Sequence, residues 1–125
     1  MNGFTFDAGA LIALDRDDRR VLLLIAAAAE RRLSITIPAT ALAQAIRLPV
    51  RQVRLTRFMR QPGVRIATLD GPAATAVGRL LALTRTSDIA DAHVVLCARR
   101  AGQAVVTSDP RDLRRIDPSL TVVEL

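Results

Sequence analysis

The chain alternates short apolar runs of β-like composition with longer helical segments, and this alternation most constrains its fold. The strand-like runs are Phe4–Asp7, Leu33–Ile37, Val64–Leu69, Gln103–Thr107 and Leu120–Glu124. The helical segments are Gly9–Leu14, Arg19–Arg31, Pro38–Arg47, a helix that begins at Pro49, one from Asp70 to Thr84, Asp88–Arg100 and Arg111–Ile116. Strands joined by helices run parallel with right-handed crossovers. The sequence therefore predicts one α/β domain over residues 1–125, with a parallel sheet of about five strands flanked by helices.

Four aspartates stand just past predicted strands or at the start of a predicted helix. Asp7 ends the first strand, Asp88 and Asp91 open a long apolar helix, and Asp109 follows the fourth strand before Pro110. Open parallel sheets build their sites at this carboxyl edge. Converging carboxylates repel one another unless protons or cations intervene, and oxygen ligands of this kind suit Mg²⁺ or Mn²⁺. Because such metal sites commonly act on phosphodiesters, the pattern predicts a metal-dependent nuclease.

Each aspartate also has an ordinary explanation, because Asp is a common N-cap of helices. Asp70 fits a capping role, and Asp17 and Asp18 fit a cap and a surface charge. Asp7 has no cap partner that the sequence makes obvious. Asp109 with Pro110 could form an ordinary turn.

Asp88 and Asp91 are three residues apart, so both face the same side of the first helical turn. One capping residue is enough for the start of a helix, so a second carboxylate on the same face indicates a further role. We therefore predict that Asp7, Asp88, Asp91 and Asp109 are metal-binding and catalytic, with Asp112 as an outer candidate.

The basic residues number 18 against 12 acidic ones, for a formal charge of +6, and all of them are arginine. Arginine binds phosphate oxygens through a planar fork, which favours a nucleic-acid partner. A GC-rich genome would produce the same bias toward Ala and Arg. With no Tyr or Trp, stacking platforms for single strands are not expected, so backbone contacts should dominate. The absence of Lys argues against a phosphorylated receiver domain and excludes a Walker-type nucleotide site.

The remaining reactive side chains fit packing roles. His93 is two residues beyond Asp91 and points to another helical face, so we expect a packed or surface residue. Cys97 is the single cysteine and sits in an apolar stretch, which predicts a buried thiol. The apolar run Val21–Ala29 is too short and too closely flanked by charge to span a bilayer. The start lacks a secretory pattern, so we expect a cytoplasmic protein without membrane association.

Four segments, taken in order, resemble PIN-domain ribonucleases, and within them the VapC toxins of bacterial toxin–antitoxin pairs. They are Asp7-Ala-Gly-Ala-Leu-Ile, Ile37-Pro-Ala-Thr-Ala-Leu-Ala-Gln-Ala-Ile-Arg, Ser87-Asp-Ile-Ala-Asp-Ala-His and Val106-Thr-Ser-Asp-Pro-Arg-Asp-Leu. The resemblance covers nearly the whole chain. It implies a PIN-like fold and a Mg²⁺- or Mn²⁺-dependent endoribonuclease, usually a homodimer, that a small cognate antitoxin holds inactive.

In the family's pattern the first acid falls on Asp7, the third on Asp91 and the fourth on Asp109, with Asp88 an extra acid one turn earlier. Where such toxins usually carry a Glu, this chain has Gln44, which brings no negative charge. Asp88 would restore the lost charge under one hypothesis. The alternative is a catalytically weakened PIN-like module that binds RNA or protein.

The remaining site candidates lie around these acids. We expect Ser108 to orient a carboxylate or water, and Arg47, Arg51 and Arg54 to hold the RNA backbone. The stretch Val53-Arg-Leu-Thr-Arg-Phe-Met alternates cationic and apolar side chains. It could accept an amphipathic helix of the antitoxin, although an ordinary core-facing helix explains it equally well. An exposed apolar patch there would favour binding.

Overall fold

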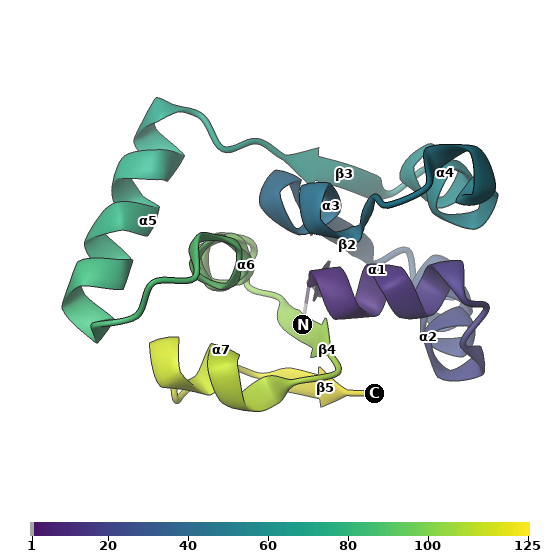
Figure 1. Cartoon of the computed structure of the whole chain (residues 1–125). Coiled ribbons are helices and arrows are strands. Elements are labelled where there is room, and N and C mark those ends of the chain that lie inside the picture. The colour runs from purple at the N-terminus through teal and green to yellow at the C-terminus, as the bar shows by residue number, and fades with distance from the viewer. Residues whose placement is uncertain (1) are drawn as a thin grey trace.

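A computed structural model describes residues 2–125, and its five strands form one parallel sheet in the order β3-β2-β1-β4-β5 (Figure 1). The strands are β1 (Gly3–Phe6), β2 (Ser34–Pro38), β3 (Val64–Ala67), β4 (Ala104–Thr107) and β5 (Val122–Glu124). All four neighbouring pairs are parallel. The predicted α/β fold with a parallel sheet of about five strands is confirmed.

The helices lie on both sides of this sheet. In Figure 1, α5 and α6 are to the left of the strands, and α2 and α4 are to the right. They are α1 (Ala8–Asp15), α2 (Arg19–Glu30), α3 (Ala39–Ala45), the 3₁₀ turn η1 (Pro49–Arg51), α4 (Val53–Met59), α5 (Gly71–Thr84), α6 (Ile89–Ala101) and α7 (Pro110–Ile116). Most bounds lie within two residues of the predicted ones.

The central strands β1 and β4 determine where a site can form. The chain runs outward from β1 to β3 on one side and returns to β4 and β5 on the other, so the strand order reverses between β1 and β4. Ligands of open α/β sheets bind at the carboxyl ends of the strands beside such a reversal. Asp7 directly follows β1, and Asp109 comes two residues after β4.

Helix α6 is fixed by its caps and by burial of its inner face. Asp88 caps its start, and Gly102 ends it in the left-handed conformation at φ 64°, as the sequence predicts. His93 is 1% exposed, and its Nδ1 lies 2.7 Å from the Thr40 hydroxyl of α3. Cys97 is also buried, and burial raises the pKa of its thiol to about 11. Both side chains have the packing roles that we predicted.

The expected helix from Pro49 is interrupted, because the side chain of Gln52 serves another segment. Gln52 is buried; its Oε1 accepts from the Arg47 amide at 2.8 Å, and its Nε2 donates to the Ala45 carbonyl at 2.9 Å. These bonds close the end of α3 and hold Gln52 at φ −98°, ψ 52°, outside the α-helical region. The prediction of one continuous helix from Pro49 is therefore wrong.

Candidate active site

Asp7 joins β1 to α1 and is held by bonds to two elements, α1 and β4. Its Oδ1 accepts from the Ala10 amide at 2.9 Å, so Asp7 caps α1. This cap was not apparent from the sequence, where Asp7 has no obvious cap partner. Its own amide donates to the Val106 carbonyl of β4 at 3.3 Å. Burial raises the pKa of the carboxyl, hydrogen bonds from Thr107 and the backbone oppose the rise, and the negative Asp109 adds to it.

Thr107 connects Asp7 with the start of α7. Its side chain is fully buried at the end of β4 and hydrogen-bonds to the Asp7 carboxyl. Its hydroxyl oxygen also accepts from the Asp109 amide at 3.0 Å. Asp109 occupies the N-cap position of α7 but makes no capping bond through its side chain. The Asp109 carboxylate is 56% exposed, with only the Arg111 Nε at 4.0 Å, and remains open to solvent.

Gly9, the second residue of α1, lies close to the loop after β4. A Cβ on Gly9 would lie 2.5 Å from the Ser108 Oγ and 3.4 Å from the Asp7 Oδ1. The first of these distances is shorter than any real side-chain contact. The exposed Ser108 is thus beside α1, but among residues 2–125 its hydroxyl has no hydrogen bond to a carboxylate, so its orienting role stays a prediction.

Asp91 is the carboxylate on which the other acids converge. It lies in the first turn of α6, is half-buried, and its amide donates to the Asp88 Oδ1 at 2.9 Å. Its pKa is raised to about 6, first by burial and then by the negative charges of four other aspartates. In decreasing order of effect these are Asp88, Asp112, Asp7 and Asp109. The five carboxylates, which we call the acidic cluster, therefore share one electrostatic environment.

The chemistry of the acidic cluster suits a hard divalent cation, because every candidate ligand is a carboxylate oxygen and mutual repulsion raises the pKa of Asp91. The side chains are not already drawn together as ligands. Among residues 2–125, no three His, Cys, Asp or Glu side chains lie close enough to hold one metal ion. The cluster thus offers the donors for a cation without a preformed cage.

The outer candidates differ in how they are placed. Gln44 is exposed in the last turn of α3, and no residue between 2 and 125 hydrogen-bonds to its side chain. Asp112 is exposed in the first turn of α7, with its Oδ1 3.8 Å from the Arg115 Nη1. Its negative charge helps to raise the pKa of Asp91, and its exposure places it at the rim of the cluster.

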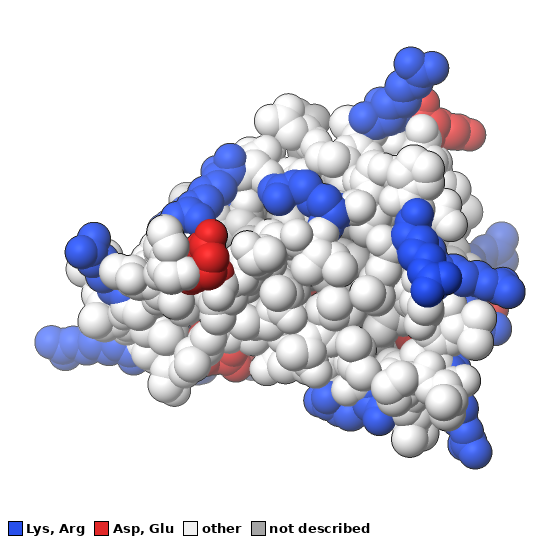
Figure 2. Space-filling view, turned by 90° about the horizontal axis from the view of Figure 1, so that it is seen from above, with Lys and Arg blue, Asp and Glu red and all other residues white. Residues whose placement is uncertain are grey.

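Arginines surround the molecule and are spread over its face in Figure 2 instead of merging into one patch. Arg47 and Arg51 line a shallow groove beside Arg16 at the end of α1. Arg54 is engaged elsewhere, since its Nε lies 3.3 Å from the Asp17 Oδ1. Of the three arginines predicted to hold RNA, Arg47 and Arg51 thus share a surface and Arg54 is paired.

The segment from the end of α3 to the start of α4 exposes apolar side chains. Ile46, Leu48, Val50 and Val53 are 38%, 57%, 88% and 49% exposed, and we call them the α3–α4 apolar surface. The inner face of α4 behaves differently: Leu55 and Phe58 are buried. Helix α4 is therefore core-facing along most of its length, and the apolar surface precedes and begins it.

A cleft that was not predicted from the sequence adjoins the acidic cluster. It has a volume of about 560 Å³ and lies between the end of α5, the start of α6 and α7. Asp88, Asp91 and Asp112 line it on one side. Its other lining residues are Thr84, Arg85, Thr86, Ser87, Arg115 and Ile116. Apart from Ser87, which opens the third of the four segments quoted above, they belong to no recognisable motif, so only the fold identifies them.

Two solved structures share this arrangement of helices and strands. One is VapBC2 from Rickettsia felis, crystallised bound to a DNA fragment from their promoter; the likeness has a TM-score of 0.69 at 15% identity and covers 98% of each chain. The other is PAE2754 from Pyrobaculum aerophilum, with a TM-score of 0.64 at 17% identity, over 97% of this chain and 83% of that one. At these identities the likeness establishes the fold alone, which is PIN-like, as predicted.

No family model matches the sequence, and no curated protein matches it. Within residues 2–125, none of the helices has the length and apolar character needed to cross a bilayer. The resemblance to PIN-domain ribonucleases therefore depends on the four motifs quoted above and on the fold.

Proposed function

We propose that this protein is a Mg²⁺- or Mn²⁺-dependent endoribonuclease, the toxin of a type II toxin–antitoxin module that acts in the cytoplasm. The observation that carries the proposal is the convergence of Asp7, Asp88, Asp109 and Asp112 on Asp91 at the carboxyl edge of the sheet. Its support from outside the chain is the PIN-like fold shared with VapBC2.

In this proposal Asp7, Asp91 and Asp109 hold the cation, with Asp88 beside them. A divalent cation in such a site activates water and offsets negative charge on the phosphate. Thr107 fixes the Asp7 carboxyl and the Asp109 amide, and so sets the spacing between β1 and α7. The Asp88 carboxylate holds the first turn of α6 and thereby orients Asp91. Arg47 and Arg51 bind the RNA backbone.

The direct test is a cleavage assay on total RNA with and without Mn²⁺, and with EDTA. Cleavage that requires the cation and stops with EDTA supports the proposal. Cleavage that continues in EDTA would contradict it, because the acidic cluster then has no role as a cation site. Intact RNA under every condition would favour a module that binds RNA or protein without cutting it.

That second candidate function has its own support in Gln44 and in the absence of a preformed ligand set among residues 2–125. Comparing the natural chain with Gln44→Glu separates the two candidates. If Asp88 supplies the charge that Gln44 lacks, the added Glu leaves cation affinity and cleavage within a few-fold. A large gain in both would contradict compensation by Asp88 and mark the natural chain as weakened.

The partner in this proposal is a small antitoxin, and a second copy of the chain forms a homodimer. VapBC2 is a complex, and the exposed α3–α4 apolar surface is a surface that a partner would cover. The arginines beside this surface favour an acidic amphipathic segment. Light scattering on the isolated chain, and on the chain co-expressed with the product of the neighbouring gene, tests both assemblies.

A further inference from the structure

The cleft beside the acidic cluster differs from the cluster in its chemistry. Carboxylates of Asp88, Asp91 and Asp112 form one wall, whereas hydroxyls and guanidiniums of the α5–α6 connection and α7 form the rest. Its volume of about 560 Å³ lies in the range of small-molecule sites, about 300–1,000 Å³. It shares Asp88, Asp91 and Asp112 with the cluster, so a molecule in it would touch the place where a scissile phosphate would lie.

The two threonines of the cleft can only accept further hydrogen bonds. The Thr84 hydroxyl donates to the Leu80 carbonyl at 2.8 Å, so its single proton is used. The hydroxyls of Thr84 and Thr86 are 2.9 Å apart, which makes Thr86 the donor of that bond and Thr84 its acceptor. Both oxygens then present lone pairs, as the carboxylates do. A ligand that fits this part of the cleft brings N–H donors.

The cations of the cleft suit a phosphate. Arg115 lies 3.8 Å from the Asp112 carboxylate, whereas Arg85 forms no ion pair with any residue from 2 to 125. Arg85 ends α5 in the left-handed conformation at φ 55°, ψ 42°, a position that usually takes glycine. The Arg85 side chain is exposed at the cleft, so its guanidinium is available to an anionic ligand.

We propose that this cleft binds the nucleotide next to the scissile phosphate, and that it prefers a base with an exocyclic amino group to uracil. Arg85 and Arg115 bind the flanking phosphate, and the Thr84–Thr86 hydroxyl pair accepts from the amino group. Adjacency to the scissile phosphate rests on the function proposed above. The choice of base rests on the direction of the hydrogen bonds: an amino group brings two N–H donors to the two hydroxyl oxygens, whereas uracil brings one, N3–H, between two carbonyl oxygens.

Mononucleotides test the base preference without any cleavage. CMP and UMP differ at C4, where cytosine carries an amino group and uracil a carbonyl oxygen, and at N3, which accepts in cytosine and donates in uracil. Their affinities in EDTA, measured by NMR titration, therefore compare the two donor–acceptor patterns. We expect CMP to bind about fivefold more tightly, the effect of one neutral hydrogen bond. Thr86→Val should remove the difference, while Thr75→Val, within α5 and outside the cleft, should keep it. Equal affinities in the natural chain, or no binding of either nucleotide, would overturn the proposal.

Two arginines in the same backbone conformation test the phosphate contact. Arg85 and Arg32 both have φ 55°, but Arg32 follows α2, away from the cleft. Arg85→Gly should weaken CMP binding about tenfold, since a charged hydrogen bond contributes more than a neutral one. Arg32→Gly removes the same charge and should leave binding unchanged. Equal losses in the two variants would show a general effect of charge and contradict the site.

Sequencing the ends of cleaved RNA then separates this inference from the proposed function. A deficit of uridine beside the cut, relieved in Thr86→Val but not in Thr75→Val, supports both. Cleavage without that deficit overturns the inference and leaves the nuclease intact. A preference for CMP without any cleavage upholds the base preference, but it overturns the nuclease and the adjacency to a scissile phosphate.

Discussion

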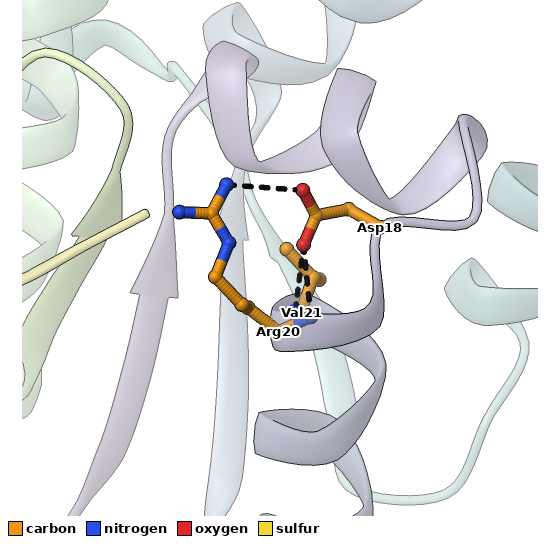
Figure 3. Close-up of polar contacts among 3 residues, drawn as sticks. All are labelled: Asp18, Arg20 and Val21. Atoms are coloured by element: carbon orange, nitrogen blue, oxygen red, sulfur yellow. Dashed lines mark hydrogen bonds and ion pairs between the residues drawn. The ribbon is translucent and has the colours of Figure 1, made fainter.

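The starts of α2 and α6 carry the same kind of carboxylate in opposite electrostatic states. At α2, Asp18 accepts from the Arg20 amide at 2.9 Å, and its other oxygen lies 3.2 Å from the Arg20 guanidinium (Figure 3). These bonds lower the pKa of Asp18. At α6, burial and four neighbouring aspartates raise the pKa of Asp91 to about 6. A helix start favours negative charge in both places, so the difference follows first from the burial of Asp91 and then from the charges of the neighbouring residues.

The direction of the pKa shift therefore distinguishes the aspartates at helix starts better than a capping bond does. Asp7, Asp18, Asp70 and Asp88 all cap helices through a bond of 2.9 Å. Asp7 combines that cap with burial and a negative neighbour, whereas Asp18 combines it with a cation. Capping therefore does not exclude a functional role.

The largest expected effect is on catalysis. Asp7→Asn keeps a side-chain oxygen for the cap of α1 but removes the charge, and it should lower RNA cleavage by on the order of 100-fold or more, since even the outer partners of metal ligands typically contribute about 10–100-fold. Asp18→Asn makes the same change at α2 and should leave the rate as it is. Rates from a fluorescent RNA assay decide this, and equal rates for Asp7→Asn and the natural chain would remove Asp7 from the mechanism.

Next in size is stabilisation by a cation. At a free Mn²⁺ concentration of about 100 times Kd, binding to the folded chain alone should raise the free energy of unfolding by about 2.7 kcal/mol. Asp109→Asn removes the charge of a proposed ligand and should abolish most of this gain. Because the Asp109 side chain makes no capping bond, the change should leave the stability without the cation as it is. Thermal unfolding with and without Mn²⁺ measures it. An undiminished gain in the variant would place the cation elsewhere.

The third prediction concerns the ionisation of Asp91 without a cation. Its folded pKa of about 6 exceeds the unfolded value, so the folded state binds the proton more tightly. Stability should fall as pH rises from about 4 to 6 and stay lower above 6. Asp91→Asn should therefore raise the free energy of unfolding at pH 7 by about 1–3 kcal/mol, after allowance for partial exposure. Urea unfolding at pH 4 and 7 tests this, and a loss of stability at pH 7 would contradict it.

The smallest effect should come from Asp18. Its lowered pKa means that its contribution is present above the ordinary carboxyl pKa and is lost as pH falls through the folded value. Asp18→Asn should therefore destabilise slightly at pH 7, opposite in sign to Asp91→Asn. Because the pair with Arg20 is exposed, added salt should reduce the difference. A gain in stability for Asp18→Asn at pH 7 would remove the contrast between the two helix starts.

The fold was predictable because it depends on local patterns. Alternating apolar runs gave the strands, and Asp70 and Gly102 marked helix ends where the structure has them. The break at Gln52 was not predictable, because it depends on bonds to the end of α3. In the site, Asp7 and Asp109 were predicted from their positions after the ends of predicted strands. The cap at Asp7 and the cleft beside Asp91 required the fold, since three separate elements form that cleft.

The central claim is that Asp7, Asp91 and Asp109 bind one divalent cation between them. A crystal of the chain soaked in Mn²⁺ tests it most directly through anomalous scattering. The account predicts a peak at about 2.0–2.2 Å from oxygens of all three carboxylates, the usual distance for small hard cations. A peak bound by other residues, or none while the three carboxylates stay apart, would contradict it.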